Sequence, residues 1–176
     1  MEVLLIIVIS ISLSMDAFSL SLAYGTLEIE KKQIYSLGII VGAFHFFMPL
    51  IGLFIGNIIF NIIKINSNIL VTIVLSIIGL EMIYESFKEE ETINKMKTIE
   101  RILFAFAVSI DSLTLGVTLN NITNNYLFAV TTFSITSAFF TILGLKLGKI
   151  IKRLIGKYST ILGGLILITI GIIYII

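Results

Sequence analysis

Two aspartates, Asp16 and Asp111, stand near the middle of long apolar stretches of this 176-residue chain. A carboxylate at the centre of a bilayer costs about 2.5–3.5 kcal/mol on insertion scales, so it should have a compensating role. Two carboxylates would also balance the charge of one divalent cation in a dry interior. The pair therefore predicts ion coordination, proton carriage or both. The alternative is a neutral, hydrogen-bonded aspartate that only locks helix packing.

Hydroxyl side chains share a helical face with each aspartate. Ser12 and Ser19 lie four residues before and three residues after the first aspartate, and Thr114 and Thr118 follow the second at similar spacing. Residues three and four apart are neighbours on a helix surface. Oxygen ligands suit hard divalent ions such as Mg²⁺, Ca²⁺ and Mn²⁺. Two oxygen-rich stripes could thus meet at one metal site.

His45 is the only histidine, and Pro49 follows it by four residues. Proline at that position removes the hydrogen bond to the carbonyl of residue 45, which predicts a kink with a free carbonyl beside the imidazole. A nitrogen ligand would shift preference toward a transition metal. The competing interpretation is a packed histidine bonded to a neighbouring helix, and both stay open at this point.

Glu81 and Glu85 are four residues apart near the end of an apolar segment, and so share one helix face. They could attract cations to the entrance of the transport path, and so they join the candidate metal residues. For Glu85, a solvated helix end that continues into the charged stretch after it is an equal alternative.

Composition places all these residues in a membrane protein. Hydrophobic residues make up 57% of the chain and charged residues 13%, and the mean hydropathy is +1.11, whereas a soluble domain is roughly half apolar and about a quarter charged. A spanning helix needs about 20 mostly apolar residues. We count six candidates, which lie at 3–24, 34–59, 68–87, 100–119, 126–147 and 158–176.

The distribution of basic residues orients these segments. With both termini outside, eleven of the twelve Lys and Arg residues fall on the cytoplasmic side, and only Lys64 is outside. Cytoplasmic loops are enriched in Lys and Arg, so this split favours that orientation. The net charge of +1 gives no reason to expect a nucleic-acid partner, and the absence of cysteine excludes disulfides and thiolate metal sites.

An internal repeat divides the chain into two halves, 1–87 and 100–176, with a charged cytoplasmic linker at 88–99. Residues 14–20 resemble 109–115 at an offset of 95, and residues 51–59 resemble 143–151 at an offset of 92, while Gly79 and Gly171 align the third and sixth segments weakly. Three spans in each half force the halves into opposite orientations. The fold class expected is therefore an all-α membrane protein of two inverted three-helix repeats, a design typical of transporters whose site lies at the repeat interface.

These motifs resemble the MntP family of bacterial manganese efflux pumps, within the wider group of LysE-like exporters. The resemblance covers nearly the whole chain and rests on Ser14-Met15-Asp16-Ala17-Phe18, Met48-Pro49-Leu50-Ile51-Gly52 with Gly56, Met82-Ile83-Tyr84-Glu85, Ser109-Ile110-Asp111 with Gly116, and Leu162-Gly163-Gly164. It implies six spans, a bacterial plasma-membrane location and export of Mn²⁺ as cargo, with no resident cofactor. It also carries the family's functional carboxylates over to Asp16, Asp111 and Glu85.

Three positions near the candidate site depart from the family pattern. Members tend to have Gln or Glu where His45 stands, a basic residue where Glu81 stands, and Ala where Ser112 stands. A related branch of the family is linked to sporulation membranes, and the residues alone leave that branch open.

We therefore expect a proton-coupled Mn²⁺ exporter, not an enzyme, whose partners are the metal ion and the lipid bilayer. Two close carboxylates cannot both stay ionised at low cost, so metal release and proton uptake would be linked. An exporter of another cation or of an amino acid is the alternative, although an amino acid would call for an intramembrane basic partner. An intramembrane aspartyl protease is less consistent, because Ser14 and Ser109 stand where such enzymes carry a glycine. The oligomeric state, a homo-oligomer included, stays open.

Overall fold

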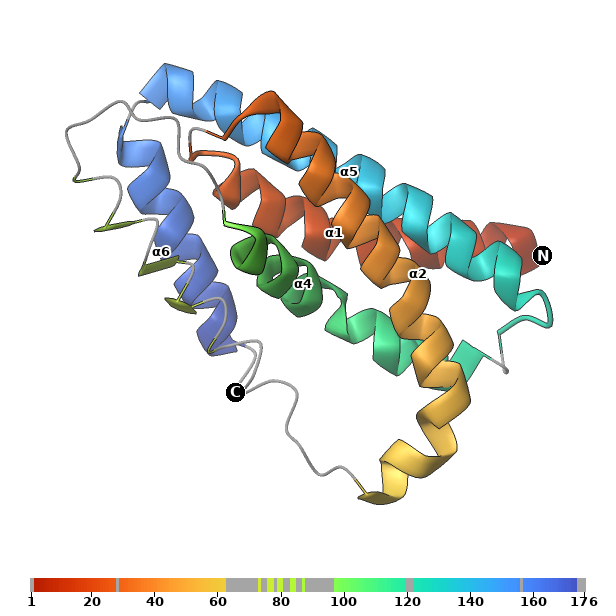
Figure 1. Cartoon of the computed structure of the whole chain (residues 1–176). Coiled ribbons are helices and arrows are strands. Elements are labelled where there is room, and N and C mark those ends of the chain that lie inside the picture. The colour runs from red at the N-terminus through yellow and green to blue at the C-terminus, as the bar shows by residue number, and fades with distance from the viewer. Residues whose placement is uncertain are drawn as a thin grey trace.

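The computed structural model describes five α-helices and several shorter pieces (Figure 1). The described residues are 2–27, 29–62, 73, 76, 77, 79, 80, 83, 84, 87, 97–119, 122–155 and 157–173. The helices are α1 (Glu2–Tyr24), α2 (Lys31–Ile62), α4 (Thr98–Thr118), α5 (Tyr126–Ile155) and α6 (Lys157–Ile173). In this part of the chain, α1, α2 and α5 each contain a stretch long and apolar enough to cross a membrane. The described part of the chain is therefore helical, as expected for an integral membrane protein.

Local capping explains where two of these helices begin. The Glu100 carboxylate accepts the backbone N–H of Lys97 at 3.0 Å, just before α4. The Asn125 side chain accepts the backbone N–H of Phe128 at 3.2 Å, at the start of α5. Each bond satisfies a donor that has no partner within the helix. The apolar stretches therefore begin close to the predicted positions.

The end of α5 differs from the sequence prediction. The sequence predicts spans at 126–147 and 158–176, but α5 continues to Ile155 and α6 begins at Lys157. Lysine, arginine, leucine and isoleucine are acceptable or good helix formers. Cations are also favourable at a helix C-terminus, where Lys152 and Arg153 lie. The charged residues at the end of α5 thus mark where the helix leaves the membrane, not where the helix ends.

The helices run in two parallel pairs. Ser10 of α1 lies near Thr136 of α5. Gly25, just after the end of α1, lies near Gly148 of α5, so α1 and α5 run in the same direction. Ser36 and Pro49 of α2 contact Arg101 and Gly116 of α4 respectively, so α2 and α4 also run in the same direction. By contrast, Gly38 and Gly42 of α2 lie near Ile142 and Ala138 respectively, so α2 and α5 are antiparallel.

Glycines allow the parallel pairs to approach closely. A Cβ atom added to Gly52 of α2 would collide with the backbone carbonyl of Leu113 in α4. One added to Gly144 of α5 would lie 2.6 Å from the carbonyl of Phe18 in α1. Small residues at such crossings are what lets membrane helices pack tightly. The helices that carry the two aspartates are each held by a glycine contact within two residues of the aspartate.

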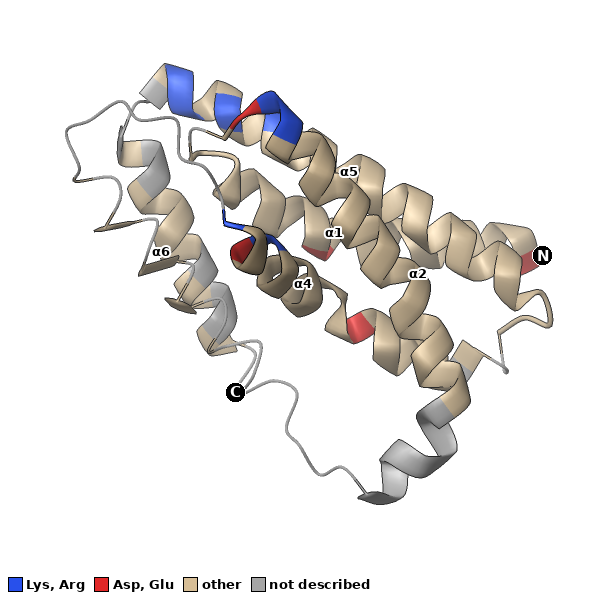
Figure 2. Cartoon of the chain, viewed as in Figure 1, with Lys and Arg blue, Asp and Glu red and all other residues tan. Residues whose placement is uncertain are grey.

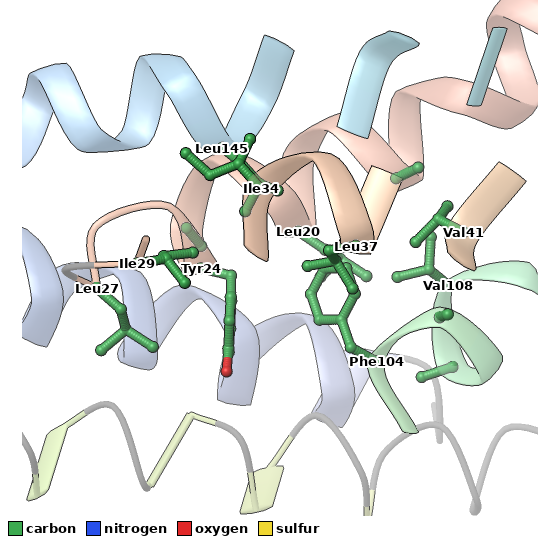
Figure 3. Packing of buried hydrophobic residues seen from close by; sticks show 14 residues of the cluster. Leu20, Tyr24, Leu27, Ile29, Ile34, Leu37, Val41, Phe104, Val108 and Leu145 are labelled. Atoms are coloured by element: carbon green, nitrogen blue, oxygen red, sulfur yellow. The ribbon is translucent and has the colours of Figure 1, made fainter. Parts of the chain in front are cut away.

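Buried apolar side chains fill both ends of the bundle. One cluster surrounds Tyr24 and Phe104, whose ring centroids are 5.2 Å apart (Figure 3). A second cluster, centred on Phe133 and Leu119, fills the opposite end. The polar residues between these clusters therefore lie at an intermediate depth.

The basic residues gather at one end of the helices (Figure 2). This is the end at which α1 and α5 finish and α2 and α4 begin (Figure 1). The same-sided distribution of the described cations agrees with the sequence prediction that they face one compartment. Helix α2 also passes through Pro49 without ending, with Pro49 inside the helix.

Candidate metal site

Asp16 and Asp111 come together in the structure. Asp16 lies on α1 and Asp111 on α4, and their side chains are within hydrogen-bonding reach of each other. They are 95 residues apart in the sequence and come from the two matching motifs. The arrangement therefore places one carboxyl from each half of the chain at a single point.

The chemistry of two adjacent carboxyls limits what can lie between them. An ionised carboxylate only accepts hydrogen bonds, so two of them need a proton or a cation between them. One oxygen of Asp111 is also held by the backbone N–H of Ser112 at 2.8 Å. The pair can thus hold a proton, a metal ion, or each in turn.

The hydroxyls predicted to share the face of the aspartates are exposed. Ser12 and Ser19 on α1, and Thr114 on α4, are all exposed, as is Asp16 itself, whereas Asp111 is half-buried. This agrees with the helical spacing that placed each set on one face. In the described part of the chain, none of the three hydroxyls hydrogen-bonds to either carboxyl. Their predicted role as ligands stays a prediction.

His45 is completely buried in α2. Its Nδ1 lies 3.0 Å from the carbonyl oxygen of Val41, within the same helix rather than on a neighbouring one. Its Nε2 is buried and has no hydrogen-bond partner among the described residues. The same residues contain no group of three or more His, Asp or Glu that could hold a metal. In the described residues His45 does not group with the two aspartates, and its role as a metal ligand stays a prediction.

A second set of hydroxyls, which sequence reasoning missed, joins α1 to α5. Ser14 and Ser137 are 3.1 Å apart between their hydroxyl oxygens, and both are fully buried. Thr136 donates to Ser10 at 3.4 Å. Ser10 and Ser14 are four residues apart and so share a helix face, which is separate from the face of Asp16. That spacing is the sequence signal that could have revealed this second set. These hydroxyls hold α1 against α5 close to Asp16 but do not contact its carboxyl.

A family model described as "Putative manganese efflux pump" matches residues 28–175. The chain belongs to this family. A protein of Bacillus pumilus named "Putative manganese efflux pump MntP" is 34% identical over 172 residues, which cover 97% of this chain and 94% of the relative. Similarly named proteins are 34% identical in Halalkalibacterium halodurans, over 97% of this chain and 95% of the relative, and in Bacillus mycoides, over 95% and 92%. No solved structure matches the chain.

Membership of the manganese efflux family confirms the resemblance drawn from the sequence motifs. The family is one of transporters, and the relatives are similar to this chain over nearly its whole length. The predicted carboxylates Glu81 and Glu85 lie outside the described residues, as does most of the predicted span 68–87. Of the predicted carboxylates, the structure brings together Asp16 and Asp111.

Proposed function

We propose that this protein exports Mn²⁺ from the cytoplasm across the bacterial plasma membrane, and that Asp16 and Asp111 bind the ion between them. The observation that carries the proposal is the meeting of these two carboxyls from matching motifs. The names of the relatives supply the identity of the ion. Two carboxylates neutralise a divalent cation, and oxygen ligands suit Mn²⁺.

The proposal includes six membrane spans with both termini outside. Helices α2 and α4 run in the same direction, although α2 ends at Ile62 and α4 begins at Thr98. In this proposal the chain returns across the membrane between these two residues, and the predicted span 68–87 is long enough to do so. With α6, that makes six spans. The gathering of Lys and Arg at one end supports the outside location of the termini.

Reciprocal contacts support an inverted repeat. Gly52 of α2 packs on the carbonyl of Leu113, and Gly144 of α5 packs on that of Phe18. Adding 95 to Phe18 gives Leu113, and adding 92 to Gly52 gives Gly144, so exchanging the halves turns one contact into the other. An odd number of spans in each half would make this relation an inversion across the membrane. Transport could then proceed by rocking one half against the other around the aspartates.

Proton coupling follows from the same pair of carboxyls. When the metal leaves, two adjacent carboxylates repel each other, and a proton taken up from outside relieves that repulsion. When Mn²⁺ binds from the cytoplasm, the proton must leave because the metal needs ionised oxygens. The exchange would therefore move metal outward and protons inward around the same two side chains.

Substitution of each aspartate tests the proposal. Asp16→Asn and Asp111→Asn keep side-chain size but remove the charge that binds the metal, so both should abolish export in cells that lack other manganese exporters. The matched control is Glu100→Gln on α4, because a Gln at that position can still cap the helix. Cellular Mn²⁺ content is measured at equal membrane levels of each variant. Full export by both Asn variants would show that the pair does not carry the ion.

A further inference from the structure

Helix α5 is longer than the hydrocarbon region of a membrane. Its 30 residues would span about 45 Å at the usual helical rise, and still about 42 Å at a typical tilt of about 20°. The hydrocarbon core is about 30 Å thick. Residues 126–145 carry no charge and are long enough to fill that core, whereas the first cation of the helix is Lys146. The segment 146–155 therefore lies at the level of the lipid headgroups.

Three basic residues form a stripe along this segment. Lys146, Lys149 and Arg153 follow one another at spacings of three and four, which places them on one side of α5. Lys31 and Lys32 at the start of α2 are exposed at the same end of the bundle (Figure 2). The stripe is therefore part of a broader cationic surface.

The contacts that Lys146 and Lys149 make with described residues are to neutral groups. The Lys146 ammonium lies 5.0 Å from the centroid of the Tyr35 ring. The Lys149 ammonium donates to the backbone carbonyl of Ile29 at 3.1 Å. The ion pair found in the described part of the chain joins Lys97 to Glu100 on α4, outside the stripe. Among the described residues, no carboxylate pairs with the stripe, so its positive charge can attract an external anion.

An apolar stripe runs beside the basic one. Leu147, Ile150 and Leu154 have the same spacing, displaced by one residue, and are 37%, 51% and 79% exposed. A helix end with adjacent basic and apolar faces is typical of segments that lie in a membrane interface. The apolar stripe continues the lipid-facing surface of α5 up to the cations. A ligand with both an anionic head and an acyl chain fits both stripes together.

Two simpler explanations account for only part of this pattern. A helix C-terminus attracts cations, but this effect is confined to the last turn and leaves out Lys146. Membrane orientation requires cytoplasmic Lys and Arg, but it does not require them to be aligned beside exposed leucine and isoleucine.

We propose that the end of α5 binds anionic phospholipid of the cytoplasmic leaflet. The headgroup phosphate lies against Lys146, Lys149 and Arg153, while an acyl chain packs along the apolar stripe. This surface is separate from Asp16 and Asp111, so the proposal does not depend on which ion is exported. It gives the protein a preference for anionic lipid at one end of one helix.

The absence of tryptophan from the chain allows a local test. Leu154→Trp places a single fluorophore in the exposed apolar stripe, and Leu127→Trp places one at the other end of α5, where Leu127 is 65% exposed. Each full-length variant is reconstituted in phosphatidylcholine vesicles that contain a small fraction of brominated phosphatidylglycerol or brominated phosphatidylcholine. Stronger quenching by the anionic lipid is expected at position 154 and not at position 127. Equal quenching by the two lipids at 154, or the same preference at 127, would overturn the proposal.

Removal of charge tests the role of the stripe. Lys146→Gln with Arg153→Gln, in the Leu154→Trp background, should reduce the preference for phosphatidylglycerol by roughly fivefold for each charge. Lys146→Arg with Arg153→Lys keeps both charges and should keep the preference. Lys149 is left unchanged because it anchors the carbonyl of Ile29. A preference unaffected by the Gln variants would refute the role of the cations.

Two further arms complete the experiment. Inorganic phosphate added at fixed ionic strength should leave the quenching unchanged, because it cannot use the apolar stripe. Loss of the preference on adding phosphate would mean that the site binds a free anion instead of lipid. If Leu154→Trp does not fold, as judged by elution in neutral detergent, Ile150→Trp reports on the same stripe.

Discussion

Gly116 of α4 offers the sharpest test of how the aspartate pair is positioned. A Cβ atom added there would collide with the Pro49 carbonyl oxygen and would lie 2.6 Å from Pro49 Cα and 2.7 Å from Pro49 C. Ordinary contact begins at 3.4 Å, so clearing Pro49 Cα alone would require α2 and α4 to separate by about 0.8 Å, and clearing the nearer carbonyl oxygen would require more. All three atoms belong to the backbone of α2, so no side-chain rotation can relieve the collision.

Two opposing energies decide the outcome of Gly116→Ala. Alanine favours a helix over glycine by about 1 kcal/mol. Overpacking at a rigid contact costs about 1–3 kcal/mol. We therefore expect a modest loss of stability and a shift of α4, which carries Asp111 only five residues away. Because metal–ligand distances must hold within about 0.2 Å, that shift should reduce Mn²⁺ export by roughly tenfold or more.

Gly42→Ala is the matched control for this prediction. Its added Cβ would lie 3.0 Å from Ala138 Cβ and from the Ser134 carbonyl oxygen, a closeness that movement of a few tenths of an ångström can relieve. Thermal unfolding in detergent and Mn²⁺ accumulation in cells are measured for both variants. Gly42→Ala should export normally. Normal export by Gly116→Ala would refute the idea that this contact sets the position of Asp111.

Three further predictions concern other parts of the molecule. If His45 binds the ion, His45→Gln should retain export but change the selection among Mn²⁺, Fe²⁺, Zn²⁺ and Cd²⁺, because the ring nitrogens are lost. Unchanged selectivity with lower stability would indicate that His45 only packs. A reporter fused after Ile176 should lie outside the cell, and a cytoplasmic signal would overturn the orientation. Ser14→Ala should cost about 1 kcal/mol by leaving the Ser137 hydroxyl unpaired, and adding Ser137→Ala should cost little more; additive costs in unfolding would contradict the pairing.

The positions of the helices could largely be predicted because hydrophobicity determines where a chain crosses a membrane. The predicted segment 3–24 corresponds to α1 at Glu2–Tyr24, and 100–119 corresponds to α4 at Thr98–Thr118. The end of α5 could not be predicted in the same way. Charged residues stop a membrane segment, but they do not stop a helix, and α5 continues about ten residues past its last uncharged turn.

The site was predictable only as far as local periodicity reaches. The position of Asp16 and Asp111 in matching motifs indicated that they would meet, and their side chains lie together. The environment of His45 was not predictable, because helical spacing tells which residues share a face but not which way that face is turned. The rotation of α2 depends on how its glycines pack against α4 and α5, and it buries His45 completely.

The third and sixth segments show how contacts can refine a repeat that the sequence aligns only weakly. Gly79 was matched with Gly171 by sequence, but in the structure a Cβ added to Gly79 would lie 2.6 Å from the carbonyl oxygen of Gly164. One added to Gly164 would lie 2.5 Å from the carbonyl oxygen of Gly79. The neighbouring contacts exchange in the same way, since Gly79 also meets Ile168 while Gly164 meets Ile83.

A two-fold relation between the halves must turn every contact between them into another contact. The offset of 85 between Gly79 and Gly164 also carries Ile83 onto Ile168, and so satisfies this condition. The sequence offset of 92 would instead carry Gly79 onto Gly171. The contact pattern therefore favours Gly164 as the counterpart of Gly79. Because the two glycines touch each other, the proposed axis of the repeat would pass between them as well as between Asp16 and Asp111.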